Sequence, residues 1–301
     1  MGQGANLRLT EIATMFDAVL LARLQFAFTI GFHILWPAYT IGISGFIVIL
    51  DVLWLRTRKL VYRDLVRYWI RLFALGFAMG IVTGVVLSYE IGANWSIFAE
   101  RTANVIAPFF SYEVLTAFFL EAGFIGVMLF GMDRFPERVH FVACLMVAVG
   151  AVMSAFWIIA ANSWMQTPAG FRIEGGKFEI ASWWNAIFTP SFPYRFAHMV
   201  TAAYLTGSFV VAGVMGWYLW RREHIAFARA GFSVAMWTAV ILAPSQLLLG
   251  DLHGLNTFHY QPIKVAAMEG DWETAARQPL VLFAWSGRVS GHRAPFFTAR
   301  I

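Results

Sequence analysis

The sequence predicts an all-α membrane protein, a polytopic bundle of about six transmembrane helices. Of its 301 residues, 59% are hydrophobic and only 13% are charged, and the mean hydropathy is +0.65. Soluble domains of this size are far less apolar. A transmembrane helix needs about 20 mainly apolar residues, and the chain holds six stretches that meet this need. They leave no room for a separate soluble domain.

Each expected span is a stretch that avoids Asp, Glu, Lys and Arg. In chain order the spans are 24–50, 72–89, 102–132, 139–171, 196–220 and 230–250. Five of them contain no such charge at all, whereas the third contains Glu113 and Glu121. A closing apolar stretch, 278–287, is too short to cross a bilayer.

Positive charge in the connections orients these spans, because Lys and Arg are retained on the cytoplasmic side. The first connection is rich in basic residues, and the third and fifth add more: Arg56, Arg58, Lys59, Arg63, Arg67, Arg71; Arg134, Arg138; Arg221, Arg222, Arg229. The opposite loops, about 92–106 and 163–194, hold few. We therefore expect the N-terminus and the segment after 251 to face outward. The pI near 9.6 then comes from basic residues that set the topology and contact anionic lipid, and it does not indicate nucleic-acid binding.

Two residues of the fourth span limit which cofactors and metal sites the chain can hold. Cys144 is the sole cysteine, which excludes an internal disulfide, a thiolate-clustered metal centre and an iron–sulfur cluster. His140, at the cytoplasmic end of this span, is interpreted as a structural histidine that forms hydrogen bonds between helices.

Four ionisable residues inside the spans are the candidate functional residues, because such groups are costly in a membrane. They are His33, Glu113, Glu121 and His198. Counted from the nearest outer arginine, His33, Glu113 and His198 lie roughly 15, 18 and 5 Å deep. All three thus belong to the outer half or the midplane.

Two interpretations of these side chains stay open on the residues alone. An imidazole can ligate haem iron inside a helical bundle, or it can hydrogen-bond across helices. Glu113 and Glu121 are eight residues apart, about 80° around an α-helix, so they can line one broad face. Such a pair can relay protons, bind cations or approach a haem, or it can pair with an arginine.

Ordered motifs from about Ala22 to Leu282 resemble subunit I of the cytochrome bd quinol oxidases, particularly the cyanide-insensitive branch with a short quinol loop. The matching residues are Leu24-Gln25-Phe26-Ala27 with His33, Gly92-Ala93-Asn94-Trp95-Ser96, Glu113 with Phe118-Phe119-Leu120-Glu121, Asn162-Ser163-Trp164-Met165-Gln166, and a block from Gly250-Asp251 to Glu273.

The resemblance implies roles for individual residues. His198 would be an axial ligand of a low-spin haem b and His33 the axial ligand of a high-spin haem. Glu113 would lie at the high-spin haem pair, with Glu121 on the route of protons to it. Lys264 and Glu269 fall where the family's quinol-binding loop keeps a lysine and a glutamate.

The resemblance also implies an activity and partners. Quinol would be oxidised at the outer face, and electrons would pass through haem b to a high-spin haem b and a haem d or second haem b. There dioxygen would be reduced to water, which contributes to the proton gradient. The expected partners are a second membrane subunit (subunit II) and a small accessory subunit, in a bacterial inner membrane.

The C-terminal part of the sequence departs from the family. Relatives continue through further spans that supply a methionine and a carboxylate ligand, and the sequence from Ser286 on abandons their pattern, which suggests a truncated or frame-shifted product. The expected segments are an outer-surface amphipathic segment (1–23), a haem-binding bundle (24–252), the start of an outward quinol loop (253–285) and a divergent tail (286–301). A non-catalytic haem-binding electron-transfer or assembly protein is the alternative, and a haem-free proton-coupled transporter a weaker one.

Overall fold

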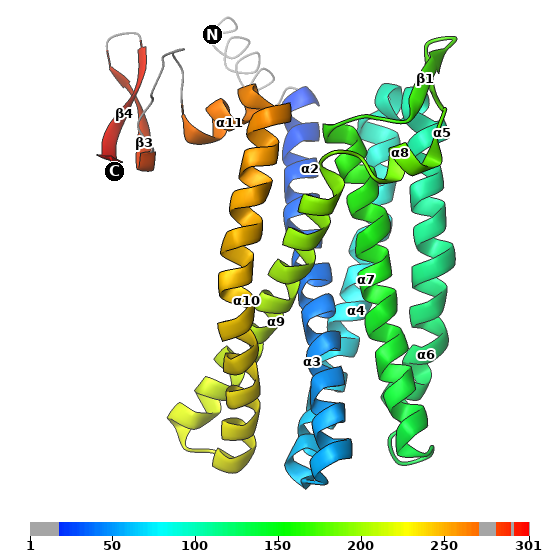
Figure 1. Cartoon of the computed structure of the whole chain (residues 1–301), viewed down its shortest axis with the longest axis vertical. Helices are drawn as coiled ribbons and strands as arrows, with labels where there is room; N and C mark the ends of the chain where they lie inside the picture. The colour runs from blue at the N-terminus through cyan, green and yellow to red at the C-terminus, as the bar shows by residue number, and fades with distance from the viewer. Residues whose placement is uncertain (1–17, 271–280, 290–291, 301) are drawn as a thin grey trace, which may run out of the picture.

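The chain folds as a bundle of six long helical segments that stand side by side (Figure 1). A computed structural model describes residues 18–270, 281–289 and 292–300. Each of the six segments is long and apolar enough to cross a membrane: Ala18–Thr57, Leu60–Asn94, Ser96–Phe130, Glu137–Gln166, Phe192–Arg221 and Ile225–Tyr260. The expected six-span fold is thus confirmed. Five of the helical segments are longer than their apolar stretches, whereas the fourth, Glu137–Gln166, ends before the expected limit at 171.

The six spans are built from the following elements in chain order. The first span is α2 (Ala18–His33) followed by α3 (Leu35–Thr57), and the second is α4 (Leu60–Asn94). The third comprises α5 (Ser96–Glu113), a π-helical turn (Val114–Phe118) and α6 (Phe119–Phe130). The last three are α7 (Glu137–Gln166), α9 (Phe192–Arg221) and α10 (Ile225–Tyr260).

A proline explains the interruption of the first span. Pro37 has no N–H to donate to the carbonyl of His33, four residues earlier, and its ring crowds that carbonyl. The α-helix accordingly ends at His33 and restarts at Leu35. The span that was expected to be continuous over 24–50 is therefore two helices, with His33 at the joint.

The expected bounds of the two outer loops, 92–106 and 163–194, are wrong. The stretch 92–106 is almost wholly helical, since α4 ends at Asn94 and α5 begins at Ser96, with Trp95 alone between them. Residues 163–166 belong to α7, so the second loop begins at Thr167. It holds a hairpin of β1 (Phe171–Glu174) and β2 (Lys177–Ile180) and the short α8 (Trp183–Ile187).

Beyond the last span the chain differs from the expected segments. Helix α10 continues to Tyr260, so the Gly250–Gly254 stretch is helical, and α11 (Pro262–Glu269) is the expected short helix. An antiparallel hairpin of β3 (Val281–Val289) and β4 (His292–Arg300) follows, although no strand was expected there. Parts of three expected segments lie outside the described residues. They are 1–17 of the surface segment, 271–280 of the quinol loop, and 290–291 and 301 of the tail.

Loops at the two ends of the bundle fit an alternating path. Helix α11, the β1–β2 hairpin and the start of α2 lie at one end, and the α3–α4, α6–α7 and α9–α10 connections lie at the other (Figure 1). This second end, called the inner end below, carries the basic connections. Arg63 and Arg67 pair with Asp133 at 2.7 and 2.8 Å, and Arg58 pairs with Glu137. These ion pairs join the first and third connections.

Helices α3 and α9 approach each other closely at a pair of glycines. A Cβ on Gly207 would lie 2.6 Å from the Cα and carbonyl carbon of Gly42, so each glycine admits the other's backbone. In contrast, a Cβ on Gly213 of the same helix would meet no atom within 4 Å. Close packing at this crossing holds α9, and hence His198, against the bundle.

This crossing predicts a large effect of one small substitution. Gly207→Val would force α3 and α9 apart, and overpacking of this kind costs about 1–3 kcal/mol or more. We expect a markedly lower yield of monodisperse protein in size-exclusion chromatography after detergent extraction. Gly213→Val is the matched control and should behave like the wild type. Equal yields of both variants would mean that the crossing does not limit stability.

Candidate functional site

One ring nitrogen of His33 forms a hydrogen bond, and the other has no hydrogen-bond partner among the described residues. Its Nδ1 lies 2.8 Å from the hydroxyl of Thr83. That hydroxyl already donates its proton to the carbonyl of Met79 at 2.8 Å, so it accepts from His33, and Nδ1 carries the hydrogen. In the neutral ring, Nε2 then keeps its lone pair. The hydrogen bond from Nδ1 to Thr83 fixes both the tautomer and the orientation of the ring, as a comparable hydrogen bond does in most metal-ligating histidines.

The imidazole ring packs directly on a glycine of α4. A Cβ on Gly84 would lie 3.3 Å from Cε1 and 4.0 Å from Nε2 of His33. Gly84 follows Thr83 on α4, so one helix both orients the imidazole and leaves bare backbone next to it. His33 can thus ligate the metal of a flat ring system.

Glu113 and Glu121 both face α7. The hydroxyl of Ser154 donates to Glu113 at 2.7 Å. Glu121 is 8% exposed and packs on Gly150, where a Cβ would collide with its side chain. Ser154 and Gly150 are one turn apart on α7, so the two carboxylates lie on the same side of the third span.

A π-helical turn accounts for this alignment. Val114–Phe118 separates the two glutamates, and such a turn adds one residue to a helical turn. The eight residues from Glu113 to Glu121 then turn about as far as seven residues of a regular α-helix. This reduces the angle between the two side chains around the helix axis from about 80° to about 20°. The single broad face that was expected is therefore narrower than an α-helix would make it.

His198 on α9 faces a polar stripe of α10. The Nε2 of Gln246 lies 3.1 and 3.2 Å from the two ring nitrogens of His198. A Cβ on Gly250 would be 3.4 Å from Cε1 of His198, and the rings of His198 and His253 have centroids 5.5 Å apart. Positions 246, 250 and 253 recur at helical spacing, so α10 presents all three to the same imidazole.

Unpaired polar atoms surround His198. Among the described residues, Oε1 of Gln246, Nε2 of His253 and Nε of Arg195 are buried without a hydrogen-bond partner. The oxygen and nitrogen of an amide can be exchanged by rotation. Rotated in this way, Gln246 would accept from one ring N–H of His198 and leave the other nitrogen free to ligate a metal.

The outer end of the bundle gathers amide and amino groups. Gln166, the last residue of α7, accepts from Lys264 Nζ at 2.9 Å and from Gln261 Nε2 at 3.0 Å. Burial and the positive charge of Arg195 hold the pKa of Lys264 below its ordinary value. Glu269 is exposed on the same short helix α11 and points to a different side, five residues on.

Several residues that complete these sites were not among the expected functional residues. Thr83, Ser154 and Gln246 are polar residues within apolar spans, and this was the signal that could have identified them. Gln166 lies in the Asn162–Gln166 motif, but its contact with α11 depends on folding. Glu90 was also missed: it is 5% exposed and its Oε1 accepts from Thr29 at 2.8 Å.

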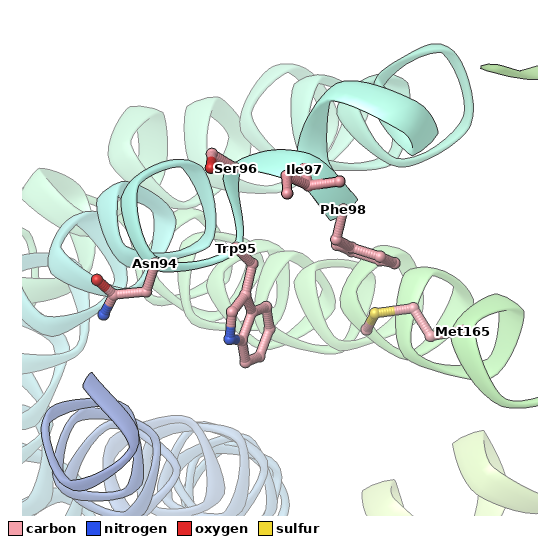
Figure 2. A pocket seen from close by; sticks show the side chains of 6 residues that line it. All are labelled: Asn94, Trp95, Ser96, Ile97, Phe98 and Met165. Carbon is pink, nitrogen blue, oxygen red and sulfur yellow. The ribbon is translucent and has the colours of Figure 1, made fainter. Parts of the chain in front are cut away.

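A cavity of about 360 Å³ opens where α4 meets α5. Figure 2 shows that Trp95 and Phe98 from this junction, and Met165 from α7, point toward the same space. Asn94 also lines the cavity, and its Nδ2 is buried without a partner in the described part of the chain. The cavity is thus mainly apolar with an amide at its edge.

Comparison with known proteins gives consistent matches. Residues 21–296 match the model of the family described as cytochrome bd terminal oxidase subunit I. Subunit 1 of the cytochrome bd-II ubiquinol oxidase of Escherichia coli is 35% identical over 274 residues, covering 90% of this chain and 53% of that protein. Subunit 1 of the cytochrome bd ubiquinol oxidase of Bacillus subtilis is 35% identical over 255 residues, 85% of this chain and 54% of that protein.

The fold is also found in a solved structure. The bd oxidase from Geobacillus thermodenitrificans superposes with a TM-score of 0.86 at 31% identity, covering 95% of this chain and 66% of that one. The chain spans about half the length of the curated relatives it matches.

Proposed function

The chain belongs to the cytochrome bd terminal oxidase subunit I family, and from that premise we propose that it carries electrons from quinol through haems to dioxygen as a subunit of a respiratory quinol oxidase. The observation that carries the proposal is His33. Its tautomer is set by Thr83, its Nε2 is free, and the adjoining backbone bears no side chain. The hydrogen bond to Thr83 uses Nδ1 and leaves the lone pair of Nε2 for a metal, which is the arrangement of a ligating histidine.

The residues present fit haem at two places. His33 would hold a high-spin haem through Nε2. His198 would hold a low-spin haem b, with its ring oriented by Gln246 and packed on Gly250. The proposed high-spin haems are a haem b and a haem d or second haem b. Bound haem supplies one-electron redox chemistry and the iron at which dioxygen is reduced.

Quinol would be bound at the outer end, between α7 and α11. Lys264 and Gln261 already share an acceptor on Gln166, so their N–H groups can donate instead to a quinone or quinol oxygen. Glu269 is exposed at the end of the same helix, and we assign to it the uptake of a quinol proton and its release to the outer water. The lowered pKa of Lys264 indicates an amino group that is partly desolvated, as a site for an amphiphile requires.

Protons would reach the dioxygen site from the inner side past Glu121 and then Glu113. Both carboxylates face α7 on one side of the third span, and the hydroxyl of Ser154 contacts the second of them. Proton release outside and uptake from inside would charge the membrane without a pump.

The oxidase would be assembled from more than this chain. The chain is a multi-pass membrane protein, and we assign it to a bacterial inner membrane together with a second membrane subunit and a small accessory subunit. Large apolar side chains such as Trp220 and Leu247, 73% and 77% exposed, fit contact with lipid or with such subunits.

A reduced-minus-oxidised absorbance spectrum of the purified chain tests the proposal. We expect a low-spin b-type signal in the wild type that weakens or vanishes in His198→Ala, because the imidazole is the proposed axial ligand. His259→Ala, which removes an exposed histidine, is the matched control and should keep the signal. Absence of haem from the wild-type chain, or an unchanged signal in His198→Ala, would contradict the proposal.

A further inference from the structure

Three ligand-bearing side chains that the proposed function does not use converge near the inner end of the bundle. Asp51 comes from α3, and His140 and Cys144 are one turn apart on α7. They are 3%, 3% and 0% exposed. A carboxylate oxygen, an imidazole nitrogen and the thiol sulfur all lie within 4.8 Å of one another. Carboxylate, imidazole and thiolate are the ligands that zinc takes in proteins.

The spacing of these atoms matches a tetrahedral site. With Zn–N and Zn–O bonds of about 2.1 Å and a Zn–S bond of about 2.3 Å, the N–O and N–S edges of a tetrahedron are about 3.4 and 3.6 Å. The structure has Nδ1 of His140 at 3.2 Å from Oδ2 of Asp51 and at 3.7 Å from Sγ of Cys144. These two edges are within about 0.2 Å of the tetrahedral values. Sγ of Cys144 also lies 3.9 Å from Nε2 of His140, so the thiol has to turn toward the Nδ1 side of the ring to share an ion with it.

The second ring nitrogen of His140, Nε2, forms the hydrogen bond that is usual in a metal-ligating histidine. Nε2 lies 3.2 Å from the carbonyl of Met128 on α6, and a carbonyl only accepts, so Nε2 carries a hydrogen. In the neutral ring the lone pair of Nδ1 then faces a carboxylate oxygen of Asp51. Two acceptors at this distance require a proton or a cation between them. Donation of the second N–H to a backbone carbonyl is the usual outer contact of a metal-ligating histidine.

Charge favours a divalent ion in this buried place. A carboxylate, a thiolate and a neutral imidazole together carry two negative charges, which a divalent cation neutralises, and a buried net charge is thereby avoided. We propose that Asp51, His140 and Cys144 bind one divalent transition-metal ion of the zinc type, with water as the fourth ligand. Binding releases two protons, one from the thiol and one shared between Asp51 and His140, so the overall charge of the site stays zero.

The site lies close to the inner surface and away from the proposed haem ligands. His140 is the fourth residue of α7, and Met128 is two residues before the end of α6. The Arg58–Glu137 pair, which joins the end of α3 to the first residue of α7, is exposed above it. An ion bound here would tie α3 to α7. The inference is independent of the oxidase proposal and of the haem residues.

Zinc K-edge X-ray absorption of the full chain, purified in detergent and equilibrated with one equivalent of ZnCl₂, tests the site. We expect about one zinc per chain, with a single sulfur neighbour at about 2.3 Å and nitrogen or oxygen neighbours at about 2.0–2.1 Å. Haem does not obscure this readout. Because Cys144 is the sole cysteine, a thiolate neighbour can come from no other residue.

Variants separate the site from adventitious binding. In Cys144→Ser and in Cys144→Ala, two near-isosteric changes, the sulfur neighbour should disappear. In His140→Ala the affinity for zinc should fall at least about tenfold. His259→Ala is the control that should leave both unchanged. Less than half an equivalent of zinc on the wild type, a sulfur neighbour that persists without Cys144, or equal affinity in His140→Ala would overturn the proposal.

Discussion

Replacing His33 by alanine is expected to remove a high-spin haem and to bring quinol-dependent oxygen uptake to background. The imidazole is the proposed axial ligand of that haem, and no other described histidine lies at the joint between α2 and α3. Carbon monoxide difference spectra and oxygen uptake should be measured in membranes that contain the chain with its oxidase partners. The low-spin signal that depends on His198 should remain, which would distinguish loss of one haem from unfolding.

The hydrogen bond to His33 supplies a graded control. Thr83→Val removes the hydroxyl that fixes the Nδ1–H tautomer, and loss of such an outer contact lowers affinity for the metal group about 10- to 100-fold. Thr83→Ser keeps the hydroxyl and should retain the haem nearly as well as the wild type. If valine and serine were equivalent, or if His33→Ala kept its carbon monoxide signal, the assignment of His33 would be wrong.

The six spans could be predicted because hydropathy reports the environment of a helix directly. The residues at which each helix begins and ends could not be predicted in the same way. Helices α4 and α5 include polar residues such as Asn94 and Glu100, which were assigned to an outer loop. Backbone hydrogen bonds continue beyond the apolar stretch wherever the chain has no strong helix breaker, so charge content marks the membrane boundary and not the helix end.

The candidate site was predictable to the extent that it consists of ionisable residues inside spans. His33, Glu113, Glu121 and His198 stand out for that reason alone. The break beside His33 could also have been anticipated from Pro37. The π-helical turn has no comparable signal, since Val114–Phe118 contains no proline or glycine. Partners such as Ser154, 41 residues from Glu113, depend on tertiary packing that periodicity does not encode.

Replacing Glu121 by glutamine is expected to slow oxygen reduction about 100-fold or more, because a positioned proton-transfer group contributes about 10²–10⁴-fold. Glutamine has nearly the same shape and fills the same space on Gly150, but it cannot carry a proton. Haem content and the signal that depends on His198 should stay unchanged. Oxygen uptake and proton uptake from the inner side, measured in vesicles, would give the two rates.

Glu113→Gln and Glu100→Gln complete this test. Glu113 lies on the same face as Glu121 and should be similarly affected, whereas Glu100 is exposed on α5 and should not. If the π-helical turn serves to align the two carboxylates, losing either should cost nearly as much as losing both, because a proton must pass each in turn. A full rate in Glu121→Gln would instead place the proton route elsewhere and leave the shared face of the two glutamates as a structural feature of α6 packed on α7.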